Sequence, residues 1–343
     1  MRPSENPMKF PDRSPLGLLR CMAGWSLALM VSAGMPASAA TSESVFPSRP
    51  VTIVVPFTPG GSPDVLARAV GQKLSERWAQ PVIVENKPGA GGNIAAAYVA
   101  RSAADGYTLL MGTDGPLAIN PFLYGKLPFD PLQDFAPAAL LASVDFMLVT
   151  QASSPAANVR DFIGLARKER PPLTYGSSGT GSQHHLGMEL FKRIAQIDLV
   201  HVPYKGVVPA LTDVMGGHVA AMFVAVPTGA PYVRSGKLKA LAVTGTERSP
   251  MVPAVPTVIE SGVPGFELRG WFGLLAPAAT PSKIVAQINE DANAVLQRPD
   301  LKATLKELGF NSLGGTPDGF ARFLRTEQGR WKQVVHDSGA KVE

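Results

Sequence analysis

The sequence has almost no cysteine: one among 343 residues, at position 21. A chain with one cysteine cannot form an internal disulfide, and it has no set of thiolates for a metal. Its stability must therefore come from a large apolar core, for which the length is sufficient. Charged residues are also sparse, at 17%, and there is no run of Lys or Arg, so a nucleic-acid-binding surface is not expected.

Long hydrophobic runs are absent except near the start. Cys21–Met35 is apolar but too short to span a bilayer, and Ala37-Ser38-Ala39 supplies the small residues of a cleavage site. Basic residues precede this run at Arg2, Lys9, Arg13 and Arg20. The pattern predicts a signal peptide, residues 1–39, cleaved near Ala39 or Ala40; an uncleaved N-terminal anchor is the alternative.

The mature chain is predicted to be soluble and nearly balanced in charge. Residues 1–39 contain four basic and two acidic residues, so their removal lowers the net charge from +5 to +3. This small excess is scattered along the chain, which favours neither nucleic acid nor a membrane surface as a partner.

Short apolar runs alternate with helical patterns, which is typical of an α/β fold with mostly parallel strands. In the first predicted helix Leu66, Val70, Leu74 and Trp78 form one buried face, and Ser62 is the expected cap. The expected strands are Val51–Val55, Val82–Glu85, Tyr107–Met111, Ala138–Leu141, Leu173–Tyr175, Leu199–Val202, Ala220–Val224 and Ala240–Val243.

The C-terminal part is predicted to be helical. Helices are expected at Pro281–Leu296, at Asp300–Leu308, and from Thr316 onward; Asn158 and Pro209 begin earlier ones. We expect the last helix to return to the first domain, so that residues 47–150 plus 265–343 form domain I and residues 151–264 form domain II. Two α/β domains joined by a hinge would place a ligand cleft between them.

The strand Val51–Val55 leads into a Pro/Gly turn and then a helix with Pro63 in its first turn. Such a turn presents backbone N–H groups at a helix N-terminus, where anions bind. Those of Gly60, Gly61 and Ser62 are the expected free donors. An ordinary strand–helix turn is the alternative.

A second unit of the same kind is Tyr175-Gly-Ser-Ser-Gly-Thr-Gly-Ser182. It supplies N–H and O–H donors before another predicted helix, and the alternative is a flexible surface loop. Ligands of open α/β sheets lie beyond the carboxyl ends of the strands, where both loops belong. Tyr204 and Lys205 follow a further strand; they either contact a ligand or are a buried tyrosine beside a solvated lysine.

Three other sites are considered and rejected. Glu85–Gly92 resembles a dinucleotide loop, but Ile94 occupies the position of its third glycine, so we expect this loop to support the cleft. Ser178 lies near His184, yet no G-x-S-x-G turn surrounds it, which disfavours a hydrolase. His184 and its neighbour His185 point in different directions on a helix, unlike a metal site. His185 is expected to pack or to form a hydrogen bond at the helix start.

These segments resemble the Bug-type extracytoplasmic solute receptors of tripartite tricarboxylate transporters. The resemblance runs from about Pro47 to the C-terminus. It includes Pro56–Gly61 with Asp64, Glu85-Asn86 with Gly89–Gly92, Asp105–Leu110, Ala118–Pro121, His201–Gly206, Gly236–Leu238 and Gly314–Pro317. One departure is Val224, where the family often has an acidic residue after Met-Phe.

The resemblance implies a two-lobed periplasmic binding protein, type II-like, that closes on a small mono- or dicarboxylate. It implies no enzymatic activity, no catalytic residue, no metal and no cofactor. Membrane permease subunits are the implied partners of a monomeric receptor. The resemblance places the ligand at the loops Phe57–Gly61 and Ser177–Gly181. The predicted ligand-binding residues are Phe57, Thr58, Pro59, Gly60, Gly61, Asp64, Thr113, Ser177, Ser178, Gly179, Thr180, Gly181, His185 and Tyr204.

Two other functions stay open at this point. A ligand sensor that binds a signalling partner would have the same sequence features, and an exported serine hydrolase would use Ser178. Backbone donors recognise a carboxylate but carry little information about the rest of the ligand. We expect the surroundings of Tyr204 and Val224 to decide which carboxylate binds.

Overall fold

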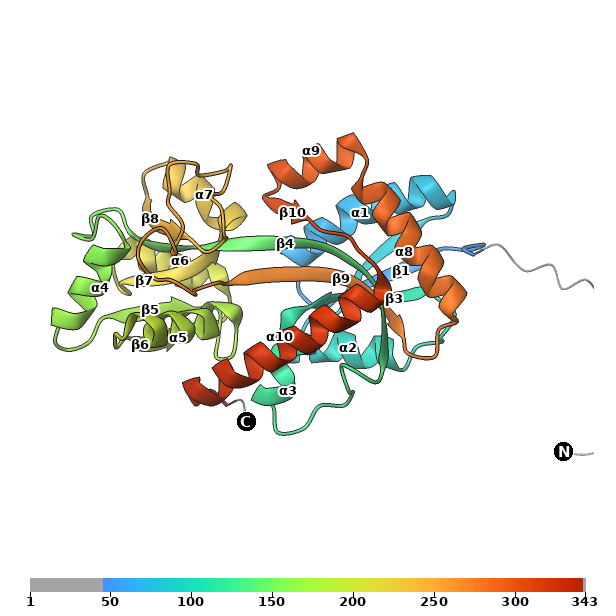
Figure 1. Ribbon diagram of the computed structural model, residues 1–343, viewed down its shortest axis with the longest axis horizontal. Helices are drawn as coiled ribbons and strands as arrows, with labels where there is room; N and C mark the ends of the chain where they lie inside the picture. The colour runs from blue at the N-terminus through green and yellow to red at the C-terminus, as the bar shows by residue number, and fades with distance from the viewer. Residues whose placement is uncertain (1–45, 342–343) are drawn as a thin grey trace, which may run out of the picture. The chain divides into compact units, whose positions relative to one another are not determined.

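The computed structural model describes residues 46–341, which lie within one compact unit (Figure 1). The predicted signal peptide and its cleavage site fall outside these residues. Ten strands form one mixed sheet. They are β1 Val51–Val55, β2 Val82–Asn86, β3 Thr108–Thr113, β4 Phe135–Gln151, β5 Thr174–Ser177, β6 Val200–Pro203, β7 Ala221–Ala225, β8 Leu238–Val243, β9 Arg269–Pro277 and β10 Phe310–Ser312.

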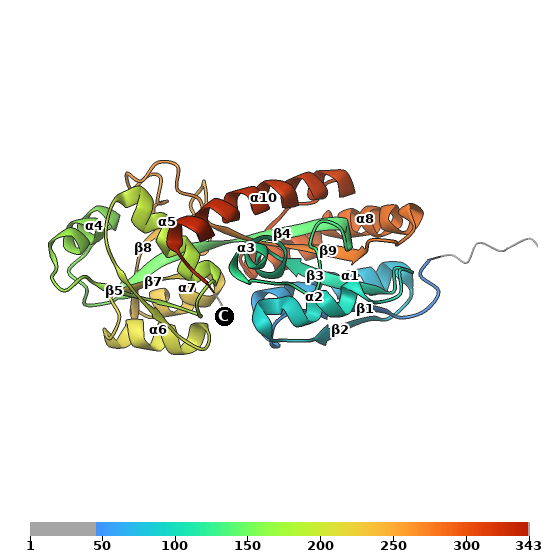
Figure 2. The ribbon, with the colours of Figure 1, turned by 90° about the horizontal axis from the view of Figure 1, so that it is seen from below.

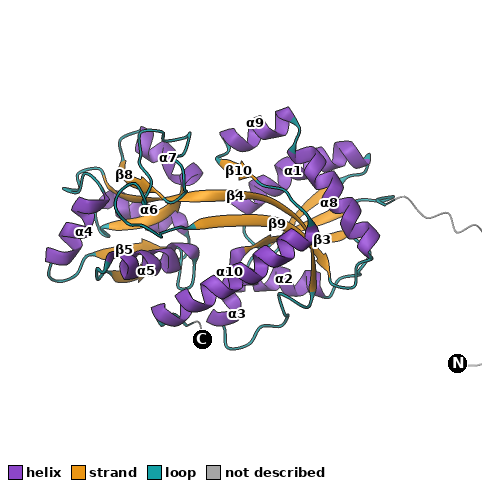
Figure 3. Cartoon of the chain, viewed as in Figure 1, coloured by secondary structure: helices purple, strands orange, loops and turns teal. Residues whose placement is uncertain are grey.

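Helices cover the sheet and connect its strands (Figure 3). The α-helices are α1 Ser62–Trp78, α2 Asn93–Ala100, α3 Asn120–Leu123, α4 Val159–Lys168, α5 Gln183–Ala195, α6 Val207–Gly216, α7 Val226–Arg234, α8 Ser282–Leu296, α9 Pro299–Glu307 and α10 Pro317–Ser338. A 3-10 turn, η1 Ala90–Gly92, precedes α2, and a π-helix, η2 Gly115–Ile119, precedes α3.

The strand order β2-β1-β3-β9-β4-β7-β5-β6 divides into two groups. We call β1–β3 the N-terminal strand group and β5–β8 the central strand group. Strands β1, β2 and β3 are parallel, as are β5, β6 and β7, and β8 pairs with β4. The parallel strands and their helices confirm the α/β prediction.

Strand β4 connects the two groups. Up to Asp145 it pairs with β9, and from Phe146 it pairs with β7, so its neighbours change between these two residues. Figure 1 shows β4 running from one group to the other. Its prediction as Ala138–Leu141 was too short, because the polar residues Ser143 and Asp145 interrupt the apolar run that the sequence shows.

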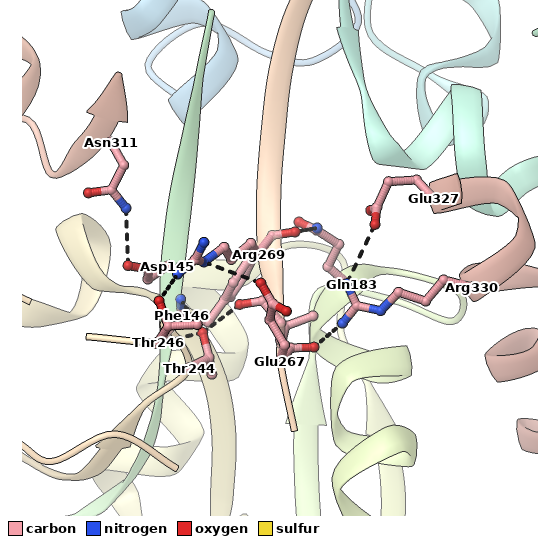
Figure 4. Close-up of polar contacts among 11 residues, drawn as sticks. Asp145, Phe146, Gln183, Thr244, Thr246, Glu267, Arg269, Asn311, Glu327 and Arg330 are labelled. Carbon is pink, nitrogen blue, oxygen red and sulfur yellow. Dashed lines mark hydrogen bonds and ion pairs between the residues drawn. The ribbon is translucent and has the colours of Figure 1, made fainter. Parts of the chain in front are cut away.

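Side chains join the chain segments where β4 changes neighbours (Figure 4). Asp145 accepts hydrogen bonds from Arg269 at 3.1 Å and from Asn311 at 3.1 Å. The buried Thr244 hydroxyl accepts from the Phe146 N–H at 2.8 Å and donates to the Leu268 carbonyl at 2.5 Å. These hydrogen bonds therefore join β4, at Asp145 and Phe146, to the start of β9 and the residue before it, at Arg269 and Leu268.

The helix ends follow ordinary capping chemistry with two corrections to the predictions. Asn158 and Thr316 cap α4 and α10 with their side chains, as predicted. Gly61 is the N-cap of α1, and Ser62 is its first residue, so the predicted Ser62 cap is wrong. Helix α6 begins at Val207, two residues before the predicted start at Pro209. Its N-cap is Gly206, whose φ of 117° is outside the helical region.

The apolar core continues through both strand groups. One large cluster includes Val54 of β1 and Phe191 of α5, and a smaller one lies around β4, β7 and β8. Helix α10 lies on one side of β4 and α6 on the other (Figure 2). Helix α10 contacts both η2 and α5, and Arg193 of α5 pairs with Asp337 of α10. The predicted domain boundaries remain a prediction.

Candidate functional site

The turn after β1 is held from within by Asp64, and its tip is exposed. The Asp64 carboxylate accepts hydrogen bonds from the Gly60 N–H at 2.9 Å and from the Asn86 amide at 3.0 Å. Asn86 also donates to the Phe57 carbonyl at 3.0 Å. Residues 57–60 are exposed, whereas Asp64 is buried. Asp64 therefore shapes the turn from below.

Asp64 is ionised in this environment. Its burial works to raise its pKa, but hydrogen bonds from Arg68, Gly60 and Asn86 outweigh that effect and lower the pKa below its usual value. Arg68 binds both carboxylate oxygens, at 2.9 and 3.1 Å. Both oxygens of this buried carboxylate already accept hydrogen bonds from the protein, which makes Asp64 a support for the turn.

The N–H groups of this turn divide into used and free donors. The Gly60 N–H, which we expected to be free, donates to Asp64, so that expectation is wrong. Within residues 46–341 the Gly61 and Ser62 N–H groups form no hydrogen bond. They lie at the N-terminus of α1, where the helix dipole favours an anion. The turn thus presents two adjacent donors.

The loop after β5 is organised in the same way. The Gly179 N–H donates to the Ser177 hydroxyl at 3.1 Å, and the Gly181 N–H donates to Nδ1 of His185 at 3.0 Å. The Thr180 N–H forms no hydrogen bond within the described residues, and Thr180 is exposed. Both glycines have positive φ, which lets the loop fold back on these acceptors.

Stacked rings hold the second loop from below. The rings of His185 and His201 stack with centroids 3.9 Å apart, and Tyr175 stacks on His201 at 5.0 Å. Nε2 of His201 lies 2.6 Å from the Ser177 hydroxyl. Burial lowers the pKa of His185 to about 4, with a smaller effect from Lys192, and burial and His185 lower the pKa of His201 to about 4. Both rings are therefore neutral near pH 7, and His185 forms the predicted hydrogen bond at the helix start.

Two residues expected near the ligand are engaged elsewhere. The Tyr204 hydroxyl donates to Asp213 at 2.5 Å, and burial together with this bond raises the pKa of Tyr204 to about 12. Val224 has no exposed surface and belongs to the smaller apolar cluster. The expectation that Val224 helps to choose the ligand is not supported by this packing.

The remaining predicted residue, Thr113, ends β3 beside an acidic residue that sequence reasoning missed. The hydroxyl of Thr113 and Oδ2 of Asp114 are both buried and lack a partner within residues 46–341. Burial, and then the nearby Glu327, raises the pKa of Asp114 well above its usual value. A lone aspartate after a strand gives no sequence signal for such burial.

Segments between the two loops connect them through close contacts. A Cβ on Gly115 of η2 would lie 3.9 Å from the Phe57 ring, and one on Gly181 would meet Leu123 of α3. Asn120 fixes α3 by donating to the Gly91 carbonyl at 3.1 Å and to Asn93 at 2.7 Å. The loop Glu85–Gly92 thus supports α3 and η2, which lie between the two predicted binding loops.

The chemistry of this region favours binding over catalysis. The Ser178 hydroxyl lies 2.8 Å from Nδ1 of His184, but burial lowers the pKa of His184 to about 4, which makes it a poor general base at neutral pH. No acidic side chain orients His184 among the hydrogen bonds of residues 46–341. Within the same residues no group of His, Cys, Asp and Glu is arranged to hold a metal ion.

Comparisons with known proteins identify the family. The family model described as "Tripartite tricarboxylate transporter family receptor" matches residues 66–340. The chain belongs to this receptor family. Protein BugT of Bordetella pertussis is 37% identical over 307 residues, covering 89% of this chain and 94% of BugT. The resemblance to Bug-type receptors is confirmed.

Solved structures of receptors agree with the fold. Rpa4515 of R. palustris, solved with adipate, is 40% identical, has a TM-score of 0.80, and is matched over 87% of this chain and 100% of its own. MatC (Rpa3494) of Rhodopseudomonas palustris, solved with bound malate, is 35% identical with a TM-score of 0.74, over 84% of this chain and 100% of its own. The predicted fold class, a periplasmic binding protein of the α/β type, is confirmed. Within the part of the chain that is described, no helix is long and apolar enough to cross a membrane.

Proposed function

We propose that this receptor captures a small carboxylate in the periplasm and holds it between the turn Phe57–Gly61 and the loop Ser177–Gly181. The observation that carries the proposal is the pair of free N–H groups of Gly61 and Ser62 at the start of α1. An oxygen of a carboxylate is the ligand that such a helix start prefers. The Thr180 N–H supplies a donor from the opposite loop.

Uncharged donors are sufficient for useful affinity. A hydrogen bond to a charged group contributes on the order of 1.5–3 kcal/mol, and a micromolar complex requires about −8 kcal/mol. Four to six such bonds offset the cost of ordering the ligand and the loops, and the three free N–H groups together with the exposed hydroxyls of Thr58 and Thr180 provide that many donors. The one arginine beside the first turn, Arg68, is already bound to Asp64, and the proposed site does not need it.

We favour a dicarboxylate over a monocarboxylate. Two receptors of 35–40% identity were solved with adipate and with malate, both of which carry two carboxylates. Two loops that each present N–H donors match a ligand with an acidic group at each end. In this arrangement Gly61 and Ser62 bind one carboxylate, and Thr180 contacts the other.

We further propose that the receptor is a monomer that delivers its ligand to the membrane subunits of a tripartite tricarboxylate transporter. It acts without catalysis, and residues 1–39 direct its export. Its two domains, with the boundaries predicted above, close about the segment where β4 changes neighbours. A role as a ligand sensor would use the same site, and deletion of the receptor gene separates the two: uptake of the ligand is lost only for a transport receptor.

The experiment is to isolate the protein from the periplasm and identify its co-purified ligand by native mass spectrometry. We expect a mass increment that matches an organic acid and disappears after unfolding and refolding. Gly61→Val serves as the test variant, because a side chain there covers the free N–H groups while the φ of −75° suits any residue. A neutral sugar or a metal ion as the only bound species would contradict the proposal, and so would undiminished loading of Gly61→Val.

A further inference from the structure

A contact between α3 and the second loop joins segments that belong to different strand groups. Gly181 is buried and has a φ of 77°. A Cβ added there would overlap Cδ2 of Leu123 and lie 3.1 Å from its Cγ and 3.2 Å from its Cδ1. All three nearest atoms belong to Leu123, so glycine leaves room for this one side chain.

The contact does not follow from the sheet. Helix α3 comes after β3, and Gly181 comes after β5; strands β9, β4 and β7 lie between β3 and β5 in the sheet. Backbone pairing therefore does not bring the two residues together. Leu123 is 5% exposed and is held by η2 and α10, which contact α3, so its side chain has little room to turn aside.

Polar contacts fix the positions of both α3, which carries Leu123, and Gly181. Asn120 ties α3 to the Gly91 carbonyl and to Asn93. On the opposite side, the Gly181 N–H donates to His185, which fixes the loop at the residue that meets Leu123. Helix α3 directly follows the π-helix η2, and π-helical turns often occur at functional sites.

We propose that Leu123 is a positioning residue for ligand binding: its side chain seats against Gly181 in the closed arrangement of the two loops, which the free protein also visits and which a ligand stabilises. This inference rests on the proposed function. Leu123 itself does not touch the ligand and acts through Gly181. It stabilises the closed arrangement, in which donors from both loops reach one molecule, and Gly181 is required because any side chain there would prevent Leu123 from seating.

The test is a suppressor experiment with adipate and malate as probes. Affinities are measured by calorimetry for the wild type, Gly181→Ala, Leu123→Ala and the double variant. Gly181→Ala is expected to raise Kd by about 10-fold or more, and the double variant is expected to return to within about 3-fold of Leu123→Ala. Equal, weak binding by Gly181→Ala and the double variant would overturn the proposal.

A matched control separates the contact from backbone strain. Gly179→Ala strains the same loop, because Gly179 has a φ of 132°, but its Cβ would meet only the Tyr204 carbonyl, at 3.5 Å. Leu123→Ala should not rescue Gly179→Ala. Rescue of both glycine variants would show a general softening of the loop and would contradict a specific Leu123–Gly181 contact.

A measurement without ligand keeps this proposal separate from the proposed function. In a Cys21→Ser background, Leu123→Cys paired with Gly181→Cys should oxidise to a disulfide faster than Leu123→Cys paired with Gly206→Cys, since Gly206 has no neighbour within 4 Å of its Cβ position. Equal rates would overturn the contact. If the wild type binds none of the acids, the proposed function fails, and the oxidation rates still decide on Leu123.

Discussion

At the scale of single residues, three of the four glycines in the turn Phe57–Gly61 and the loop Ser177–Gly181 use their N–H groups within the chain. The N–H groups of Gly60, Gly179 and Gly181 donate to Asp64, Ser177 and His185. Side chains below each loop thus fix its shape, and the neighbouring Gly61, Ser62 and Thr180 keep free N–H groups. The glycine pattern predicted where these loops lie. Which N–H groups stay free depends on the local geometry by which Asp64, Ser177 and His185, each within four residues, turn back onto the loop, and the residue pattern does not specify that geometry.

Asp64 should therefore matter for affinity although it is buried under the turn. We expect Asp64→Ala to lower the free energy of unfolding by about 1.5–3 kcal/mol, because bonds to a buried charge are lost, and to abolish detectable ligand binding. Asp161→Ala is the matched control, since Asp161 accepts from the Ala157 N–H at 3.1 Å in the first turn of α4, on an exposed surface. Chemical denaturation and calorimetry measure both effects. An Asp64→Ala protein that binds like Asp161→Ala would contradict this role.

His185 should make the stability depend on pH. Its pKa is about 4 in the folded chain and about 6.5 in the unfolded chain. Between these values the unfolded chain takes up a proton that the folded chain does not, so the free energy of unfolding falls as the pH drops from about 6.5 toward 4. His201 and His184 add to this trend, and Asp114, whose pKa is raised, opposes it.

The variant His185→Asn isolates this contribution. An Asn side chain can still accept from the Gly181 N–H but does not titrate. We expect the loss of Tm between pH 7 and pH 5 to be smaller in His185→Asn than in the wild type. The same loss in both proteins would mean that His185 is not a neutral acceptor at pH 7.

At the scale of elements, the strands that the sequence predicted are those with short, uninterrupted apolar runs. Strand β1 has the predicted ends, and β3 and β7 are shifted by only one or two residues. Strand β4 was predicted too short, and β9 was not predicted at all. Strand β4 has a part in each strand group, because it changes neighbours after Asp145, whereas β9 begins at Arg269 opposite Asp145 and pairs with β3 and β4. A single hydrophobic pattern does not describe a strand that passes from one packing environment to another.

The variant Thr244→Val tests the hydrogen bonds that join β4 to the residue before β9. Thr244→Val keeps the shape but leaves the Phe146 N–H and the Leu268 carbonyl without their partner. We expect a loss of about 1–3 kcal/mol in the free energy of unfolding, since these groups stay buried. Thr280→Val is the matched control, because the Thr280 hydroxyl is also buried but forms no hydrogen bond within residues 46–341. It should be close to neutral, and equal losses in the two variants would contradict the role of Thr244.

At the scale of the whole molecule, the described residues 46–341 connect the two strand groups through β9 and β4, while α10 contacts both η2, after β3, and α5, after β5. The apolar core is also shared, so the sequence could predict two α/β groups but not how closely they are joined. The α/β class could be predicted because the alternation of strands and helices is regular, and the family could be predicted from its motifs. The strand order was not predicted, and neither were the roles of Leu123 and Asp114, which arise from contacts between segments far apart in the sequence.

A receptor of this construction should become more compact when it binds its ligand. We expect the radius of gyration from small-angle X-ray scattering to fall on addition of the acid that binds, because closure brings the two loops together. Gly61→Val should keep the value of the free protein at the same concentration of acid. An unchanged radius in a wild-type protein that is saturated with ligand would contradict closure about β4.

The central claim is that free N–H groups of two loops recognise a carboxylate. Calorimetry with matched pairs of ligands tests it most directly: adipate against adipamide, and malate against malamide. Each pair has one carbon skeleton and differs only in the acidic groups. We expect binding of at least one acid and no detectable binding of its amide. Equal binding of an acid and its amide, or binding of neither acid beside tight binding of a neutral sugar, would contradict it.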